Sequence, residues 1–305
     1  MSMIKRIFLF LAANIAIIAV ISIILSVLHV QPYLTPYGPN LESLIIYATI
    51  VGFTGSFISL LLSKWMAKMA FSIQIITDPR GEEEANLFAT VKRLAEQAGI
   101  GMPEVGIYES REPNAFATGY SRNKALVAVS TGLLRSMDQD ELEGVLAHEI
   151  SHVANGDMVT MALLQGVVNT FVIFFARIAA YAVQNFLNRG KDDNGQIGGL
   201  AYYLTSIVFE IFFGILASIL VMWFSRWREF RADAGSAQLA GSAKMIAALK
   251  KLQVLTATVP VQDTRGKSFR SMQISDHPNR FFALFSSHPP LEARIEALQK
   301  GRDNF

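Results

Sequence analysis

Four long stretches of the chain carry almost no charge, and more polar segments separate them. The apolar runs cover residues 7–28, 44–62, 158–183 and 200–224, and only Arg177 and Glu210 interrupt the last two. About 20 consecutive apolar residues are enough for a helix to cross the hydrocarbon core of a bilayer. The pattern therefore predicts an α-helical integral membrane protein with four transmembrane helices in two hairpins.

The first apolar run follows Lys5 and Arg6, so a cleaved signal peptide is an alternative to a membrane anchor. The run is longer than the apolar part of an ordinary signal peptide, and no clear small-x-small cleavage site follows it. We therefore expect the first helix to remain as an anchor.

The remaining residues divide the chain into alternating membrane and soluble parts. Residues 1–63 and 158–224 would form the two membrane hairpins, while residues 64–157 and 225–305 would form soluble lobes. In the first lobe, the pattern of apolar positions predicts a helix at 81–98 and strands at 105–108, 114–119 and 125–129. In the second, it predicts a helix at 291–299. We expect an α+β domain whose small sheet precedes a helix that begins near Asp138.

Basic residues gather on one side of the predicted spans. They precede the first span, follow the second and follow the fourth: Lys5, Arg6, Lys64, Lys68, Arg226, Arg228 and Arg231. Lys and Arg accumulate on the cytoplasmic side of membrane helices. We therefore expect a multi-pass protein of the cell inner membrane with both termini and both lobes in the cytoplasm.

Composition supports a membrane protein and excludes other classes. Hydrophobic residues make up 51% of the 305 residues, and charged residues make up 17%, below the roughly one quarter that soluble proteins contain. The net charge of +2 and the lack of a basic tract argue against a nucleic-acid partner. Since there is no cysteine, disulfides and thiolate metal ligands are excluded.

The first predicted lobe ends with the sequence HEISH, in which His148 and His152 are four residues apart. On a helix, both imidazoles then lie on one face and can bind one zinc ion. Glu149 can take a proton from a water on that ion, which is the chemistry of a zinc hydrolase. The alternative is a pair of half-exposed helix histidines. Asp138 and Glu141 resemble a capping box and support the helix, which we expect to run nearly straight into the third span.

A third ligand is expected after the fourth span. In the segment SRWREFRAD, Glu229 and Asp233 lie on one helix face. Glu229 can complete a His₂Glu set, and Asp233 can accept the second ring N–H of a ligand histidine. An ordinary charged helix beside the membrane is the alternative.

In the first lobe, Asn114–Ala117 are expected to form an edge strand that can pair with an extended peptide substrate. The alternative is an ordinary strand without a role in binding.

The motifs PNAFATG, HEISH, SRWREFRAD and SSHPPLEARI together resemble the HtpX family of membrane zinc metalloproteases and, more distantly, the zinc CAAX prenyl proteases. The resemblance covers almost the whole chain. It implies a gluzincin-like peptidase core with one zinc ion, cutting damaged membrane proteins at the cytoplasmic face in quality control and the stress response.

The same resemblance implies a role for individual residues. It assigns the metal to His148, His152 and Glu229, general-base catalysis to Glu149 and support of a ligand to Asp233. It also implies that Asn114, Ala115, Phe116 and Ala117 line the substrate cleft.

The other three histidines have different expected roles. His288 precedes two prolines and matches a His-Pro position of the wider family. There it would stabilise the oxyanion of the tetrahedral intermediate. The alternative is a loop residue that caps the following helix. We expect His277 in a loop, and His29 on the membrane side opposite the metal. The polar stretch 256–276 is a candidate cover for the cleft.

Two features concern the membrane part. Arg177 and Glu210 have similar expected depth, and since charges within spans are usually paired, we predict an ion pair, with outward snorkelling of Arg177 as the alternative. Gly52 and Ser56, four apart, would allow close helix packing, or they face lipid.

Two other functions remain open. One is a CAAX-type prenyl-protein protease, which four spans disfavour because those relatives carry more. The other is a non-catalytic scaffold or transporter with structural zinc, which a closed fourth ligand would favour. The expected partners are the lipid bilayer and membrane-protein substrates, and self-cleavage is a further expectation.

Overall fold

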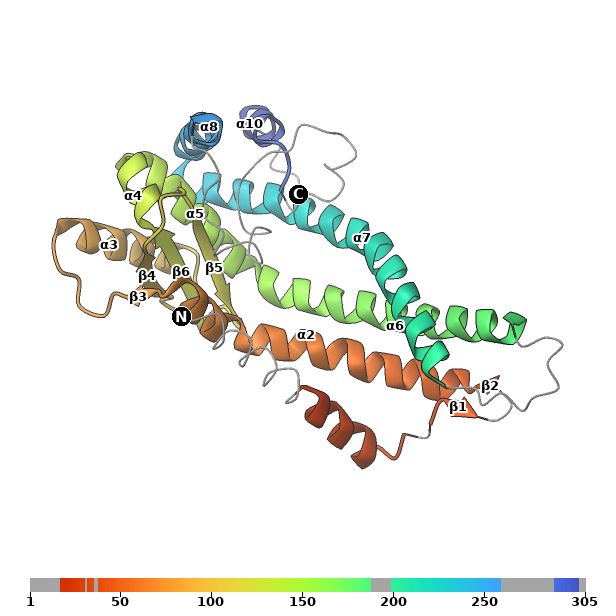
Figure 1. The fold of residues 1–305 in the computed structure, drawn as a ribbon. Coiled ribbons are helices and arrows are strands. Elements are labelled where there is room, and N and C mark those ends of the chain that lie inside the picture. The colour runs from red at the N-terminus through yellow and green to blue at the C-terminus, as the bar shows by residue number, and fades with distance from the viewer. Residues whose placement is uncertain (1–16, 31, 36–37, 188–198, 259–287, 302–305) are drawn as a thin grey trace. The chain divides into compact units, whose positions relative to one another are not determined.

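The structure is a computed structural model that describes residues 17–30, 32–35, 38–187, 199–258 and 288–301. It divides into two compact units. The first unit combines Met1–Ser59 with Ala162–Leu220, and the second combines Leu60–Met161 with Val221–Phe305. Both predicted soluble segments therefore belong to the second unit. Figure 1 labels the helices and strands.

Three helices in the described residues are long and apolar enough to cross a membrane: α2 (Leu41–Phe71), α6 (Asp157–Leu187) and α7 (Leu200–Ala240). They contain the predicted spans 44–62, 158–183 and 200–224. Ile17–Val27 form a shorter apolar helix, and residues 7–16 lie outside the described part of the chain. The count of four spans thus stays a prediction. Large apolar side chains such as Phe171, Ile211 and Leu216 are about half exposed, as lipid-facing residues are.

In the first unit, α2 and α6 approach closely through small residues. Ser56 Oγ donates a hydrogen bond to the carbonyl oxygen of Ala162, and a Cβ on Gly52 would lie only 2.8 Å from the backbone nitrogen of Thr170. The expected close packing is therefore present. The predicted ion pair is confirmed as well, because Arg177 Nη1 lies 2.6 Å from Glu210 Oε1. Short strands β1 (Leu34–Thr35) and β2 (Gly38–Pro39) form an antiparallel hairpin.

The second unit contains a four-stranded mixed sheet. Its order is β3 (Gln74–Ile75), β4 (Glu104–Tyr108), β6 (Ala125–Ser130) and β5 (Ala115–Gly119), and only β4 and β6 are parallel. Strand β6 is buried along its whole length because both faces are covered. Val127 and Val129 face the main core, while Ala128 faces a small cluster with Tyr108 and Phe116.

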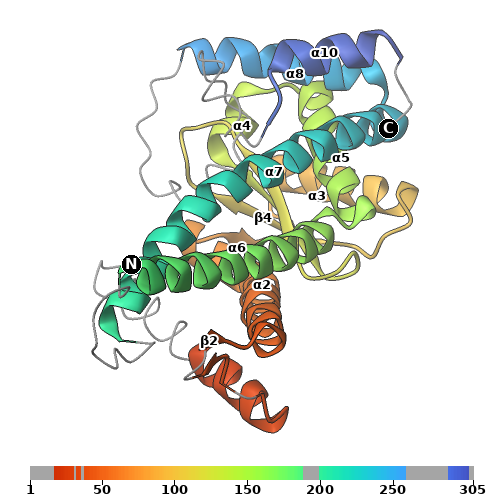
Figure 2. The same ribbon diagram turned by 90° about the vertical axis from the view of Figure 1, so that its right-hand side faces the viewer.

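Helices complete this unit around the sheet. They are α3 (Glu82–Gln97), α4 (Thr131–Ser136), α5 (Gln139–Asn155), α8 (Ser242–Thr258) and α10 (Leu291–Gln299). Leu146 and Ile150 of α5 lie in the main core with Leu249 of α8 and Ile295 of α10. Figure 2 shows α8 and α10 side by side, and α5 contacts α8, α3 and β5. The HEISH helix is therefore held from several sides.

The expected straight continuation of this helix into the third span is wrong. Helix α5 ends at Asn155, and Gly156 adopts a left-handed conformation with φ 70° and ψ 28°. Its N–H donates to the carbonyl oxygens of His152 and Val153, which satisfies groups that a helix end leaves unpaired. Glycine, without a Cβ, adopts this conformation easily. Helix α6 begins immediately afterwards, at Asp157.

Candidate metal centre

Helix α5 begins where the sequence indicates, at a capping box. Asp138 Oδ1 accepts a hydrogen bond of 2.9 Å from the backbone nitrogen of Glu141, and Glu141 Oε2 accepts one of 3.0 Å from the nitrogen of Asp138. This prediction is confirmed. The cap fixes the start of a helix on which residues 144–153 are all buried.

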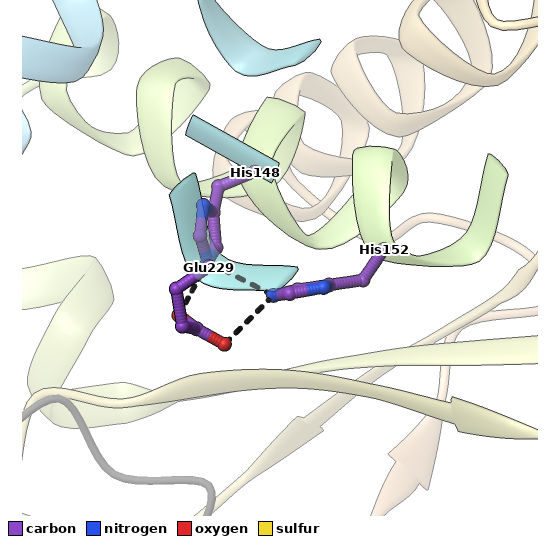
Figure 3. A group of neighbouring side chains, drawn as sticks. All are labelled: His148, His152 and Glu229. Carbon is purple, nitrogen blue, oxygen red and sulfur yellow. Dashed lines mark hydrogen bonds and ion pairs between the residues drawn. The ribbon is translucent and has the colours of Figure 1, made fainter. Parts of the chain in front are cut away.

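His148 and His152 on α5 point toward Glu229 on α7 (Figure 3). The two Nε2 atoms are 3.1 Å apart, and each is 3.3 Å from one oxygen of Glu229. All three residues are less than a tenth exposed. The structure thus brings the three predicted ligands, far apart in sequence, into one buried cluster.

The distances fit a metal ion. Zinc binds nitrogen and carboxylate oxygen at about 2.0–2.2 Å, so tetrahedral ligand atoms lie roughly 3.3–3.5 Å from one another. The observed separations of 3.1 and 3.3 Å agree closely. Both Glu229 oxygens are buried and lack a well-aligned hydrogen bond from the described residues. A cation among the three groups would satisfy this carboxylate.

Each ligand histidine also meets a carboxylate on its other ring nitrogen. His148 Nδ1 lies 3.0 Å from Asp233 Oδ1, and His152 Nδ1 lies 2.6 Å from Asp157 Oδ2. Carboxylates accept hydrogen bonds, so each Nδ1 carries a proton, and the neutral form of each ring would direct the Nε2 lone pair toward Glu229. Positive charge between the two Nε2 atoms and the carboxylate, as protons on the rings or as a metal ion, would offset the negative charge of Glu229.

A buried arginine neutralises Asp233. Arg294 on α10 donates from Nε to Asp233 Oδ2 at 2.8 Å and from Nη2 to Oδ1 at 2.6 Å. Its Nη1 lies 3.8 Å from Glu229 Oε2. Burial opposes the charge, but Asp233 outweighs burial and raises the pKa of Arg294. Helix α10 is therefore part of the centre.

His288 also reaches the centre from the segment just before α10. Its Nδ1 lies 2.8 Å from Glu229 Oε2, and its side chain is 9% exposed. The contact places an imidazole beside the carboxylate of the cluster, where the sequence suggested either an oxyanion donor or a helix cap. Helix α10 has Pro290 as its N-cap residue, without a side-chain cap.

The electrostatic field of the centre favours positive charge. Burial alone would lower the pKa of His148, but hydrogen bonds to Asp233 and Glu229 outweigh burial and raise it to about 9. The pKa of His152 is also raised despite burial, through Glu229 and Asp157. A field that draws protons to the imidazoles draws a divalent cation in the same way, because both neutralise the same carboxylates.

Glu149 follows His148 on α5 and is 7% exposed. Its charge acts on Tyr108 of β4 and on Arg294. Burial raises the pKa of Tyr108, and Glu149 adds to that rise. The carboxylate therefore lies in the same buried region as the cluster of His148, His152 and Glu229.

Strand β5 lies at one edge of the sheet and contacts α5. Within the described residues, β5 pairs with β6 alone. The carbonyl of Asn114 accepts a hydrogen bond of 2.9 Å from the nitrogen of Ser130, and its side chain donates to Tyr108 Oη at 2.9 Å. Backbone groups alternate in direction along an antiparallel strand, so Ala115 and Ala117 direct theirs away from β6. The side chain of Phe116 packs against Tyr108.

The remaining sequence predictions fall elsewhere. His29 is exposed in the first unit, with its Nδ1 3.0 Å from the carbonyl oxygen of Val27, and it does not contribute to the cluster. His277 lies outside the described residues. So does most of the stretch 256–276, whose first three residues belong to α8.

Sequence reasoning missed Asp157 and Arg294. A signal for Arg294 exists, because Leu291, Arg294, Ile295 and Leu298 occupy one face of α10 at helical spacing. An arginine in an otherwise apolar stripe indicates a buried partner. Asp157 follows Gly156 directly, but nothing in the local pattern indicates that it turns back to His152.

Comparison with known proteins identifies similar sequences over most of the chain. The family model described as Peptidase family M48 matches residues 82–302. The chain is 54% identical over 303 residues to "Protease HtpX" of Tolumonas auensis, covering 98% of this chain and 100% of that protein. It is 51% identical over 299 residues to "Protease HtpX homolog" of Methylacidiphilum infernorum, covering 98% and 99%.

A solved structure is also similar. The crystal structure of S. mikatae Ste24p matches with a TM-score of 0.67 and 21% sequence identity over 97% of this chain. This chain spans 65% of that longer one. At this level of identity, the likeness shows a shared fold and nothing more.

Proposed function

This chain belongs to peptidase family M48 and is a membrane metalloprotease, and on that premise we propose that it is a zinc-dependent endopeptidase that cleaves misfolded or damaged membrane proteins at the cytoplasmic face of the cell inner membrane. The proposal depends most on one observation. Nε2 of His148, Nε2 of His152 and the carboxylate of Glu229 converge at 3.1–3.3 Å, with each imidazole oriented by a separate carboxylate.

The proposed roles follow from the positions of the side chains. His148, His152 and Glu229 hold one zinc ion per chain, and Asp233 orients His148. A zinc ion held there would supply a Lewis acid beside the scissile carbonyl and lower the pKa of a nearby water. Glu149 would act as the general base that takes a proton from the attacking water and then as the acid that passes it to the leaving amine.

His288 is proposed as a donor to the carbonyl oxygen during this attack. Its Nδ1 lies 2.8 Å from Glu229 Oε2, so the imidazole is beside the carboxylate that would hold the metal. Preformed donors to a developing oxyanion contribute about 2.7–4 kcal/mol in hydrolases.

The substrate is proposed to bind as an extended strand along β5. The outward backbone groups of Ala115 and Ala117 offer pairing for one strand of peptide, while Asn114 and Phe116 set the position of that edge through Tyr108. Pairing through the backbone makes few demands on side chains, which suits an enzyme for damaged proteins of varied sequence. Cleavage of a second copy of the chain is expected on the same grounds.

The membrane location is supported by α7. Trp223 and Trp227 with Arg226 and Arg231 form a band of aromatic and basic residues, and Arg231 stacks 5.1 Å from the ring of Trp227. Such bands mark the membrane surface, and excess Arg marks its cytoplasmic side. Glu229 lies within this band on the same helix.

The experiment uses full-length protein in detergent and compares the wild type with Glu149→Gln. Metal content is measured by mass spectrometry, and cleavage of casein and of a reconstituted membrane protein is followed with and without chelator. Glu149→Gln should keep about one zinc per chain and lose at least 10²-fold in turnover. Glu83→Gln, an exposed change on α3, is the matched control and should leave both unchanged.

Clear proteolysis by zinc-loaded Glu149→Gln would exclude Glu149 as the base. A wild type that binds zinc but shows no chelator-sensitive cleavage would favour the non-catalytic scaffold. Cleavage restricted to prenylated C-terminal peptides would favour the CAAX-type alternative.

A further inference from the structure

Arg294 is the largest side chain among the described residues that is almost fully buried. A buried guanidinium is unfavourable unless partners compensate the loss of water. A hydrophobic residue would fill the same face of α10, beside Leu291 and Ile295, without that loss. The presence of an arginine therefore requires a reason beyond packing.

We propose that Arg294 is a positioning residue of the metal centre. Arg294 fixes the carboxylate of Asp233, and Asp233 in turn fixes the imidazole of His148. These contacts together set the affinity of the site for zinc. This inference depends on the metal site proposed above. It does not place Arg294 in contact with the substrate.

The geometry gives Arg294 control over the orientation of Asp233. The guanidinium donates to both carboxylate oxygens, at 2.8 and 2.6 Å, and such two-pronged pairing fixes the carboxylate plane. Oδ1, the oxygen bonded to Nη2, is the same atom that accepts from His148 Nδ1 at 3.0 Å. Rotation of Asp233 about its side-chain bonds would break all three contacts, so Arg294 also fixes the direction of the imidazole.

The two ligand histidines differ in this respect. Asp157, which meets His152, begins helix α6 and forms no ion pair with a lysine or arginine in the described part of the chain. Asp233 is paired with Arg294, whose Nη2 shares Oδ1 of Asp233 with His148 and lies 3.4 Å from His148 Nδ1. The pair of Arg294 and Asp233 is neutral as a unit, so it supplies direction to His148 without adding net charge beside a divalent ion.

Two alternative roles of Arg294 predict different results. If Arg294 acted only through its charge, its loss would remove repulsion from a nearby cation and would strengthen zinc binding. If Arg294 served only to join α7 to α10, its loss would lower stability and leave zinc affinity unchanged. Only positioning through Asp233 predicts weaker zinc binding that requires Asp233.

The experiment measures the zinc dissociation constant of full-length protein in detergent by competition with a chromophoric chelator. Arg294→Gln should weaken binding by about 10- to 100-fold, the range for outer partners of metal ligands. Arg294→Lys should also weaken it, because one ammonium cannot reproduce the fork of the guanidinium. Asp233→Asn should have a similar effect, and adding Arg294→Gln to it should change the constant by less than about threefold.

Lys300→Gln, at the exposed C-cap of α10, is the control and should bind zinc like the wild type. Thermal unfolding of each zinc-free variant separates folding defects from affinity. Zinc affinity in Arg294→Lys within about twofold of wild type, tighter binding in Arg294→Gln, or an unchanged constant in Asp233→Asn would each overturn the inference. If Arg294→Gln does not fold, the other two variants still decide. A wild type that binds no zinc would instead refute the proposed function.

Discussion

Replacing Asp157 by Asn tests whether the carboxylate at the start of α6 orients the imidazole of His152, a proposed metal ligand. Asp157 Oδ2 lies 2.6 Å from His152 Nδ1, and Asp157 is 3% exposed. Asn is nearly isosteric and can still accept from Nδ1 through its amide oxygen, but it has no charge. Because the side chain keeps its size and shape, stability should change little.

The expected magnitude follows from the kind of hydrogen bond. A bond to a charged acceptor contributes about 1.5–3 kcal/mol, and a neutral one about 0.5–1.5 kcal/mol, so the loss is about 1–1.5 kcal/mol. Since about 1.4 kcal/mol is tenfold in an equilibrium constant, Asp157→Asn should bind zinc about tenfold more weakly. Asp157→Ala removes the acceptor altogether and should approach the roughly 100-fold end of the range for such partners.

The assay is chelator competition on full-length protein in detergent, with the thermal unfolding of the zinc-free protein measured in parallel. Asp78→Asn, an exposed Asp in the same unit, is the matched control and should behave like the wild type. If Asp157→Asn binds zinc as tightly as the wild type while folding normally, the charge of Asp157 does not orient His152, and the reasoning is refuted.

Two further predictions concern packing. A Cβ on Gly144 would lie 2.7 Å from the carbonyl oxygen of Lys244, so Gly144→Ala should force α5 and α8 apart. The free energy of unfolding should fall by about 1–2 kcal/mol, although Ala has the better helix propensity. An unchanged unfolding midpoint would contradict this contact. Arg177→Gln and Glu210→Gln should each lower the unfolding midpoint of the detergent-solubilised protein. The double variant should show a coupling energy of about 0.5–3 kcal/mol. Additive effects of the two changes, or an effect of Glu210→Gln alone, would contradict the ion pair.

Local patterns were sufficient to predict several elements of this fold, although β3, α4 and α8 were not predicted. The capping box at Asp138 and Glu141 places the start of α5, because both contacts lie within one helical turn. The spacing of His148 and His152 follows from helix geometry alone. Strands β4, β5 and β6 and helix α10 are found within a residue or so of their expected limits, since their apolar periods are short and clear.

Long-range contacts and one junction escaped prediction. The Asn-Gly pair at 155–156 is a typical helix end, but the apolar run that follows favoured a continuous helix. In the structure, Gly156 adopts a left-handed conformation that ends α5. Arg294 meets Asp233 across 61 residues of sequence. Such a contact depends on how α7 and α10 pack, which no local spacing specifies. The same is true of Asp157, whose side chain turns back to His152.

The participation of α10 in the centre has a consequence for biosynthesis. A ribosome makes α5 first, α7 later and α10 last of the three, so a copy still being inserted already holds its HEISH helix while Asp233 lacks its guanidinium partner. Until residues 288–294 emerge, the nascent chain has neither His288 nor Arg294 beside Glu229. With the roles proposed here, the order of translation would delay completion of the site until α7, the last of the three long apolar helices, has been made.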